Sequence, residues 1–199
     1  MPGAASTYNP AMTGDAYLTD QLLIAMPAMQ DGNFARTVAY VCRHSADGAM
    51  ALVVNRPIGL SMADILEQLK LGAGTPGLAA MPVLSGGPVQ TDRGFVLHAD
   101  DGRPWESSLS VRPGLCLTTS RDILVALAED RAPSPLLFAL GYAGWGAGQL
   151  DRELLENAWL TVPADQAILF DTPVEQRWQA AADLVGVDLS RMSGYAGRA

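Results

Sequence analysis

The amino-acid sequence predicts a single α+β domain with a mixed β-sheet. The chain has 199 residues, of which 49% are hydrophobic and 17% charged, so it is long enough for one sizeable core and short for two domains. Its first half holds apolar runs of strand length joined by a hairpin signal, and its second half alternates strands with helices. A purely parallel sheet would need a crossover helix between the early strands as well, so a mixed sheet is expected.

The first 17 residues are expected to form a flexible tail in front of this domain. They are rich in Pro, Gly, Ser and Thr and show no hydrophobic periodicity. No internal repeat is evident in the rest of the chain. We therefore place one domain over residues 18–199.

The domain is predicted to begin with three strands. Residues 22–27 are a continuous apolar run closed by a proline, and residues 36–44 are rich in β-branched and aromatic side chains. The dipeptide Asp-Gly at 47–48 follows, and it tolerates positive φ at both central positions of a tight turn. The sequence therefore predicts a hairpin in which residues 37–43 pair with residues 49–54.

A short helix and a further strand are predicted next. Ser61 and Asp64 have the spacing of a capping box, and the amphipathic pattern after them ends near Gly72. The tripeptide Gly-Gly-Pro at 86–88 is predicted to form a turn between two short apolar runs. Residues 94–99 are predicted to form a strand that follows this turn.

The second half of the domain is predicted to alternate strands and helices. The expected strands cover residues 114–119, 135–140 and 167–170, and the expected helices cover residues 120–130, 149–159 and a last segment after residue 172. The last helix carries the clearest local signals, because Thr172 has the position of an N-cap, Pro173 that of the first helical residue and Gly186 that of the C-terminal glycine.

The protein is acidic, and its basic residues form no run in the sequence. It has 13 basic and 21 acidic residues, a net charge of −8 and a single lysine, Lys70. Binding to a nucleic-acid backbone calls for clustered basic side chains that replace condensed counterions. Because the arginines are scattered singly, direct nucleic-acid binding is disfavoured, although the sequence does not determine whether distant arginines gather into a basic face.

The sequence shows no sign of export, of a membrane span or of a metal centre. It has no apolar run of about 18 residues and no signal peptide, which predicts a cytoplasmic protein without membrane contact. Cys42 and Cys116 form no C-x-x-C pair and are interpreted as reduced, buried thiols. His44 and His98 are the only histidines, and Cys42 with His44 supplies half a metal site at best. No metal and no cofactor is therefore expected.

The stretch GYAGWGAGQL, residues 141–150, raises the question of a phosphate-binding loop. A predicted strand precedes it and a predicted helix follows it, which is the arrangement that phosphate sites use. However, the glycine spacing matches no nucleotide motif, and Asp151 with Glu153 already occupies the positive end of the helix dipole. The glycines are therefore interpreted as a loop whose tight bend brings chain segments close together, with Tyr142 and Trp145 packed over it.

Three segments with special backbone requirements are each expected at the end of a strand, where loops on a rigid scaffold usually carry function. They are residues 55–57, residues 86–88 and the glycine bend that begins at residue 141. In the segment Asn55-Arg56-Pro57, Arg56 is interpreted as a structural ion-pair partner for an acid or as a binder of an anionic ligand, and the structural role is favoured. Together the segments predict a shallow binding surface. Its candidate residues are Asn55, Arg56, Pro57, Gly86, Gly87, Pro88, His98, Gly141, Tyr142, Gly144, Trp145, Gly146 and Gln149.

An ordered set of motifs resembles the YqgE/AlgH family. The motifs are LLIAMP followed by Asp31 and Phe34, DGAMALVVNRP, GGPV, GFVLH, GYAGWGAGQLDREL and NAWL, and they extend from about Leu18 to Tyr195. The family signature, GYAGWG followed by Gln-Leu and an acidic helix, is matched at Gly141, Tyr142, Ala143, Gly144, Trp145, Gly146, Gln149 and Leu150.

The resemblance implies a bacterial cytoplasmic protein with a bifurcated or barrel-closed β-sheet surrounded by helices. It implies little chemistry, because members of the family are described as uncharacterised. Their label as regulators of transcription comes from a link to alginate expression and not from a DNA-binding motif. The sequence likewise shows no helix-turn-helix with a basic recognition helix.

The expected function is that of a non-enzymatic binding or regulatory module in the cytoplasm, which acts on gene expression indirectly and binds a protein or a small molecule. Two alternatives stay open. An enzyme would use His98 or Arg56 in a cleft near Trp145, with His98 in contact with an acid or with a cavity of substrate size. A DNA-binding regulator would present a gathered arginine face. The sequence determines neither the ligand nor the oligomeric state.

Overall fold

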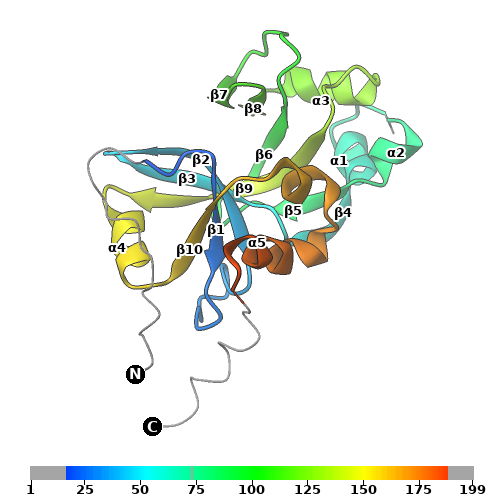
Figure 1. The fold of residues 1–199 in the computed structure, drawn as a ribbon. Coiled ribbons are helices and arrows are strands. Elements are labelled where there is room, and N and C mark those ends of the chain that lie inside the picture. The colour runs from blue at the N-terminus through cyan, green and yellow to red at the C-terminus, as the bar shows by residue number, and fades with distance from the viewer. Residues whose placement is uncertain (1–16, 73, 188–199) are drawn as a thin grey trace, which may run out of the picture.

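The computed structural model describes residues 17–72 and 74–187. Most of the expected tail and Tyr195 lie outside the described residues. Ten strands form one curled sheet, a half-barrel with helices around it, so the expected single α+β domain is confirmed (Figure 1). None of the helices in the described ranges is long and apolar enough to span a membrane.

The strands run in the order β10-β1-β2-β3-β9-β6-β8-β7, with β5 also beside β9 and β4 beside β5. Neighbouring strands are antiparallel except β5 and β9, which are parallel. The strands are β1 (Gln21–Ala25), β2 (Val38–Ser45), β3 (Gly48–Val53), β4 (Pro57–Ser61), β5 (Pro82–Ser85), β6 (Val89–Ala99), β7 (Ser108–Arg112), β8 (Leu115–Thr118), β9 (Leu136–Gly146) and β10 (Trp159–Pro163).

Helices cover both faces of this sheet. In Figure 1, α4 and α5 lie in the half that holds β1, β2, β3 and β10, whereas α1, α2 and α3 lie in the half that holds β5 to β8. The helices are α1 (Met62–Gln68), α2 (Pro76–Ala79), α3 (Arg121–Ala128), α4 (Gln149–Leu155) and α5 (Arg177–Val185), with a π-helical turn at Ala167–Asp171 and a 3₁₀ turn at Val174–Gln176.

Strand β9 joins the two halves of the sheet and is the place where the sheet divides. Residues 136–140 of β9 pair with β6 on one side and lie beside β5 on the other. Residues 143–146 pair with β3 instead. The change occurs at Gly141, which has φ +73°, and a Cβ atom there would lie 2.5 Å from the carbonyl oxygen of Gly87. The bifurcation therefore depends on a residue without a side chain.

The predicted glycine loop is wrong, because residues 141–146 form the second half of β9. Glycine generally disfavours strands, but here it lets neighbouring backbones approach. A Cβ atom at Gly48 would overlap the carbonyl oxygen of Trp145, and one at Gly87 would overlap the backbone of Tyr142. The glycines that suggested a loop therefore allow tight strand packing.

The predicted hairpin is confirmed. β2 pairs with β3 from Ala39 opposite Val53 to Ser45 opposite Gly48. The turn residues are 46–47, one position earlier than expected, and Gly48 is the first residue of β3. The shift is explained by the close approach of β9 to Gly48. Gly48 is needed for packing between the two strands, so it lies in β3 and not in the turn.

The predicted helix ends are confirmed in part. Ser61 and Asp64 form the expected capping box of α1, and Gly186 ends α5 with φ +71°. Helix α5 begins later than expected, because the Thr172 hydroxyl donates back to the carbonyl of Ala167 at 2.9 Å. Thr172 therefore closes the π-helical turn and does not cap the helix that follows.

Several other elements differ from the sequence predictions. Trp159 begins β10 and does not end a helix, and residues 167–171, expected as a strand, form the π-helical turn. The strand at residues 108–112 and the short helix at residues 76–79 were not predicted from the sequence. Strands β7 and β10 are edge strands, so tertiary pairing on one side decides their conformation.

Three apolar clusters form the core. The first lies on the concave side of the sheet beneath α5 and includes Tyr40 and Trp178. The second lies on the opposite side beneath α4 and includes Trp145 and Trp159. The third packs β5, β6 and β9 against α1 and α3 and includes Phe138. Adjacent residues of β1, β2 and β3 alternate between the first and second clusters, and those of β6 and of residues 137–139 in β9 alternate between the first and third, as the two-residue period of a strand requires.

One ion pair connects the edge strand β7 to the residue that precedes β1. Arg112 on β7 places its Nε atom 3.1 Å from an Oδ atom of Asp20, which precedes β1. The Tyr40 hydroxyl donates to the same oxygen at 2.9 Å. Burial raises the pKa of Tyr40, and the hydrogen bond and charge of Asp20 raise it further. The side chain of Asp20 therefore connects β7 with β2 and with the start of β1.

Candidate functional site

The three segments that carry the sequence-predicted site residues meet at β9. The amide of Ser85 donates to the carbonyl of Arg56 at 2.7 Å, the amide of Val53 donates to the carbonyl of Gly86 at 2.8 Å, and the amide of Gly86 donates to Leu140. Gly86 and Gly87 in turn lie against the backbone of residues 141–143. The segments are therefore neighbours, joined by backbone hydrogen bonds.

The polar side chains of the first segment hold a neighbouring loop. The Arg56 guanidinium donates to three backbone carbonyls, those of Gly32, Asn33 and Ala35, at 2.7 to 3.1 Å. The Asn55 carboxamide accepts from one backbone amide and donates to one carbonyl of the chain around residues 36–38. Arg56 therefore has a structural role in this fold, and its partners are carbonyl groups in place of the expected acid.

The end of β9 belongs to a closed aromatic group that we call the Glu153 cluster, formed by Phe34, Trp145, Gln149, Glu153 and Trp159. One carboxylate oxygen of Glu153 accepts from the indole nitrogens of Trp145 at 2.9 Å and Trp159 at 2.8 Å. Gln149 donates to the other oxygen at 2.9 Å. The Phe34 ring stacks on Trp145 with centroids 6.0 Å apart. The two indoles are 6% and 3% exposed, so the tryptophans of this cluster lie in the interior, and the other three residues are half-buried.

His98 lies far from this cluster in the other half of the sheet. Its side chain is 1% exposed. Its Nδ1 atom is 2.8 Å from the carbonyl oxygen of Ala99, and its Nε2 atom is 2.8 Å from the hydroxyl of Thr118. These are its polar contacts within the described ranges, and neither is with an acid. The ring lies edge-on to Trp105, with centroids 6.1 Å apart.

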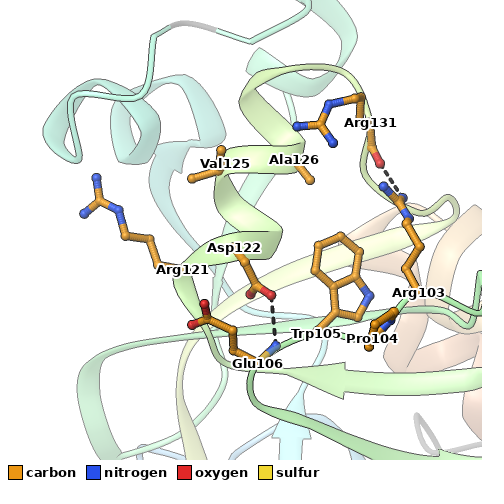
Figure 2. Close-up of a pocket in the computed structure, with 9 residues that line it drawn as sticks. All are labelled: Arg103, Pro104, Trp105, Glu106, Arg121, Asp122, Val125, Ala126 and Arg131. Carbon is orange, nitrogen blue, oxygen red and sulfur yellow. Dashed lines mark hydrogen bonds between the residues drawn. The ribbon is translucent and has the colours of Figure 1, made fainter.

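A cleft of about 590 Å³ opens beside Trp105, which we call the Trp105 cleft (Figure 2). It lies between the segment that precedes β7 and the outer side of α3. Its lining residues are Arg103, Pro104, Trp105, Glu106, Arg121, Asp122, Val125, Ala126 and Arg131. The sequence reading missed this site. The available signal was a tryptophan between charged residues in a polar segment, where an apolar ring is usually not placed without a packing partner.

Asp122 fixes the two walls of the Trp105 cleft to each other. One of its carboxylate oxygens accepts the backbone amide of Glu106 at 2.9 Å, and the other accepts the Ser120 hydroxyl at 2.6 Å and the amide of Ile123 at 2.9 Å. Burial acts to raise the pKa of Asp122, but these hydrogen bonds outweigh it and hold the pKa below its usual value. The carboxylate is therefore ionised at neutral pH and its charge is engaged locally.

The indole nitrogen of Trp105 is buried and has no hydrogen-bond acceptor among the residues that the structure describes. The Arg103 guanidinium lies over the same ring, 4.9 Å from its centroid. Arg103 also contacts the carboxylate of Asp101 and donates to the carbonyl of Arg131. In Figure 2 the indole nitrogen faces the side of the ring on which Arg103 lies.

The Trp105 cleft is more basic than the protein as a whole. Three of its lining residues are arginines and two are acids, whereas the whole chain has a net charge of −8. Two of the arginines have acidic neighbours, Asp101 for Arg103 and Glu129 for Arg131. The third, Arg121, donates to the carbonyl of Leu69 at 3.2 Å and separates the cleft from a smaller hollow of about 190 Å³.

These features define a single-domain α+β protein with a half-barrel sheet and an open cleft beside one helix. No group of three or more His, Cys, Asp or Glu side chains in residues 17–72 and 74–187 is placed to hold a metal ion. The chain belongs to the AlgH-like (DUF179) family, whose model matches residues 22–190.

Relatives and solved structures agree with this assignment. The UPF0301 protein Tgr7_2910 of Thioalkalivibrio sulfidiphilus is 53% identical over 94% of this chain and 100% of its own length. A UPF0301 protein of Nitrosococcus oceani is 51% identical over 92% of this chain and 97% of its own. The solution structure of AlgH from Pseudomonas aeruginosa matches with a TM-score of 0.75 and 48% identity over the full length of both chains. These names assign no activity.

A more distant structure shares the fold alone. The crystal structure of protein DIP2367 from Corynebacterium diphtheriae matches with a TM-score of 0.70 at 18% identity, over 92% of this chain and 94% of that one. The overall fold is therefore kept where about four fifths of the residues differ.

Proposed function

We propose that this chain is a non-enzymatic binding module whose ligand site is the Trp105 cleft. The observation that carries the proposal is the Trp105 indole N–H, which is buried beside an open cleft of about 590 Å³ and has no acceptor in residues 17–72 and 74–187. Pockets that hold small molecules have volumes of this order, with apolar walls and a few convergent polar groups. Loops that a rigid scaffold positions are also the usual place for binding.

The chemically able side chains support binding over catalysis, because structural bonds already occupy them. Arg56 donates to three carbonyls, and Glu153 accepts from two indoles. His98 is buried between a hydroxyl and a carbonyl. A general base needs an accessible proton acceptor within reach of a substrate, and these groups offer none as they are arranged.

An effect on gene expression would be indirect in this proposal. Binding to a DNA backbone requires many simultaneous contacts from Lys and Arg, and two of the three arginines in the Trp105 cleft have acidic neighbours. A ligand-bound module would act through a partner molecule, with the occupied cleft changing the surface that the partner meets.

Fragment binding followed by nuclear magnetic resonance tests the proposal. The full ¹⁵N-labelled chain would be screened with small aromatic fragments that are anionic, neutral or cationic. We expect chemical-shift changes to concentrate in residues 103–107 and 120–126. Val125→Arg, which places a long side chain in the cleft, should abolish these changes. Leu155→Arg on α4, a position 69% exposed and outside the cleft, should leave them intact.

Two results would contradict the proposal. Shift changes that map to the Glu153 cluster would place the site at the end of β9 instead. An absence of shift changes near Trp105 for every fragment at millimolar concentration would remove the cleft as a binding site.

A further inference from the structure

We infer that the Trp105 cleft takes an organic anion, whose carboxylate or phosphate oxygens bind the Trp105 indole N–H and the Arg103 guanidinium while its apolar body lies on α3. This inference rests on the proposed function and specifies the ligand of the same site.

The four tryptophans of the chain provide an internal comparison. Trp145 and Trp159 donate to Glu153, and Trp178 donates to the carbonyl of Ala25 at 3.1 Å. Trp105 alone among the four has no acceptor in the described part of the chain. Buried polar groups are almost always paired, so an unpaired one is a position where a bound molecule can supply the acceptor. The ligand must therefore offer a lone pair at this position.

The neighbour of this indole decides the charge of the acceptor. The Arg103 guanidinium covers the Trp105 ring and is 40% exposed, so water reaches it from outside. Arginine has five N–H donors and no acceptor, and the known contacts of Arg103 in the fold are with Asp101 and the carbonyl of Arg131. In the proposed complex the Arg103 side chain moves aside from the buried Trp105 nitrogen, and the ligand oxygen that binds this nitrogen also meets N–H groups of Arg103. Charge-assisted bonds of this kind are stronger than neutral ones, so an anion is favoured.

The acids of the cleft do not cancel this preference. Asp122 already accepts three hydrogen bonds, from Ser120, Glu106 and Ile123, which leaves its charge engaged away from the ligand. Glu106 is exposed at the rim. Arg121 lines the same cleft at the start of α3, and its contact in the described part of the fold is the backbone carbonyl of Leu69 and not an acid, so its charge favours a negative group there (Figure 2).

The remaining wall determines the shape of the ligand body. Val125 and Ala126 present an apolar side of α3 to the cleft, and Pro104 lies opposite on the segment that carries Trp105. Bodies that bury flat apolar surface against such walls gain from the hydrophobic effect. A small aromatic or aliphatic acid or phosphate ester matches this arrangement, and a free inorganic ion would use only half of it.

The indole resonances of the full ¹⁵N-labelled chain test the inference directly. Four tryptophans give four indole signals, and the Trp105 signal is identified by its loss in Trp105→Phe. The probes are benzoate and phenyl phosphate, with benzamide as the neutral control and inorganic phosphate as the control without a ring. We expect both organic anions to shift the Trp105 signal downfield while those of Trp145 and Trp159 stay in place. Benzamide and inorganic phosphate should bind at least about tenfold more weakly, which is the effect of one charge-assisted contact or of the lost apolar body.

Two arginine variants separate the charge from the fold. Arg103→Gln should weaken benzoate binding by about tenfold or more and leave benzamide binding unchanged. Arg43→Gln, at an exposed position on β2, is the matched control and should change neither. A larger loss of affinity in Arg103→Gln for benzoate than for phenyl phosphate would identify the ligand as a carboxylic acid. The reverse order would identify a phosphate ester.

The outcomes distinguish this inference from the proposed function. Equal affinity for benzamide and benzoate at residues 103–107 would overturn the anion preference and leave the binding module standing. Binding of inorganic phosphate as tight as phenyl phosphate would overturn the role of the apolar wall. A Trp105 indole signal that no anion moves would overturn the inference, and the fragment screen would then decide the proposed function separately.

Discussion

The Glu153 cluster and the Trp105 cleft solve the same chemical problem differently. Both contain a buried indole N–H that lies beside a short helix, α4 in the cluster and α3 in the cleft. In the Glu153 cluster one carboxylate satisfies two indoles at 2.8 and 2.9 Å, and the aromatic rings pack against one another. In the Trp105 cleft the acid at the start of α3 is Asp122, whose oxygens accept hydrogen bonds from groups other than the indole. Its indole is left without an acceptor in the described chain.

The difference teaches where to look for function in this fold. The segment that is most conspicuous in the sequence, with its glycines and aromatic residues, is saturated by its own contacts and serves the packing of β9. The plain polar segment around Trp105 leaves a hydrogen-bond donor unsatisfied beside a cleft. A complete network is evidence for structure, and an incomplete one is evidence for a missing partner.

The largest effect is expected where β9 crosses the turn after β5. Gly87→Ala should destabilise the protein by more than about 3 kcal/mol or prevent folding. Gly87 has φ +148°, and the new Cβ atom would also overlap the backbone of Tyr142. Urea unfolding measures the change. Gly77→Ala in α2, where a Cβ atom meets nothing within 4 Å, is the control and should be neutral or stabilising. Equal stability of the two variants would show that the crossing is not tightly packed.

The next effect tests the saturated half of the comparison. Glu153→Leu should cost about 2 to 4 kcal/mol, because two buried indole donors lose their acceptor together. Glu153→Gln, which keeps one carbonyl oxygen, should cost less. Both are measured by urea unfolding at pH 7. Glu156→Leu, at an exposed position at the end of the same helix, should change stability by no more than about 0.5 kcal/mol. A cost as small for Glu153 as for Glu156 would mean that the carboxylate is not needed.

A smaller and pH-dependent effect is expected at the acid of the Trp105 cleft. Asp122→Asn should cost about 1 kcal/mol at pH 7, since the carboxylate lies in the first turn of α3, where negative charge is favourable, and accepts the amides of Ile123 and Glu106. The pKa of Asp122 is lowered in the folded state, so its contribution is complete above the unfolded pKa of about 3.9 and is lost as the pH falls through the folded value. The difference between the two proteins in urea unfolding should therefore shrink below about pH 4. A difference that stays constant from pH 7 to pH 3 would exclude a charged Asp122 as its source.

The smallest effect sharpens the comparison most. Trp105→Phe should lie within about 0.5 kcal/mol of the wild type, because the change removes a buried donor that has no acceptor among the residues the structure describes. Trp159→Phe removes a bonded donor and should cost clearly more, about 1 kcal/mol or above. Unfolding curves of the two variants, measured side by side, decide the point. Equal losses would mean that Trp105 has an acceptor in solution.

The parts of the fold that the sequence predicted are those with local causes. The hairpin of β2 and β3 follows from two apolar runs around a turn dipeptide, and the capping box at Ser61 and Asp64 lies within one helical turn. The last glycine, Gly186, ends α5 because its own φ is positive. Each of these signals acts between residues that are close in the chain, so composition and spacing were sufficient.

The parts that the sequence did not predict depend on distant partners. β10 is a strand because it pairs with β1, from which most of the chain separates it. Residues 141–146 are a strand because β3 lies beside them. The candidate site follows the same rule. Arg56 could be an anion binder by its sequence, but three carbonyls of residues 32–35 occupy it in the fold.

The sequence by itself determined the α+β class, the family, the early strands and the need for glycines at the close approaches, because propensity, period and missing side chains act locally. The tertiary structure alone decided which hydrogen-bonding groups found partners. A donor is satisfied or left bare by whatever the fold places within about 3 Å of it, and that neighbour is set by packing across the whole sheet. For this reason Trp145 and Trp159 lie in the Glu153 cluster with an acceptor for their N–H groups, whereas Trp105 lines an open cleft without one in the described chain.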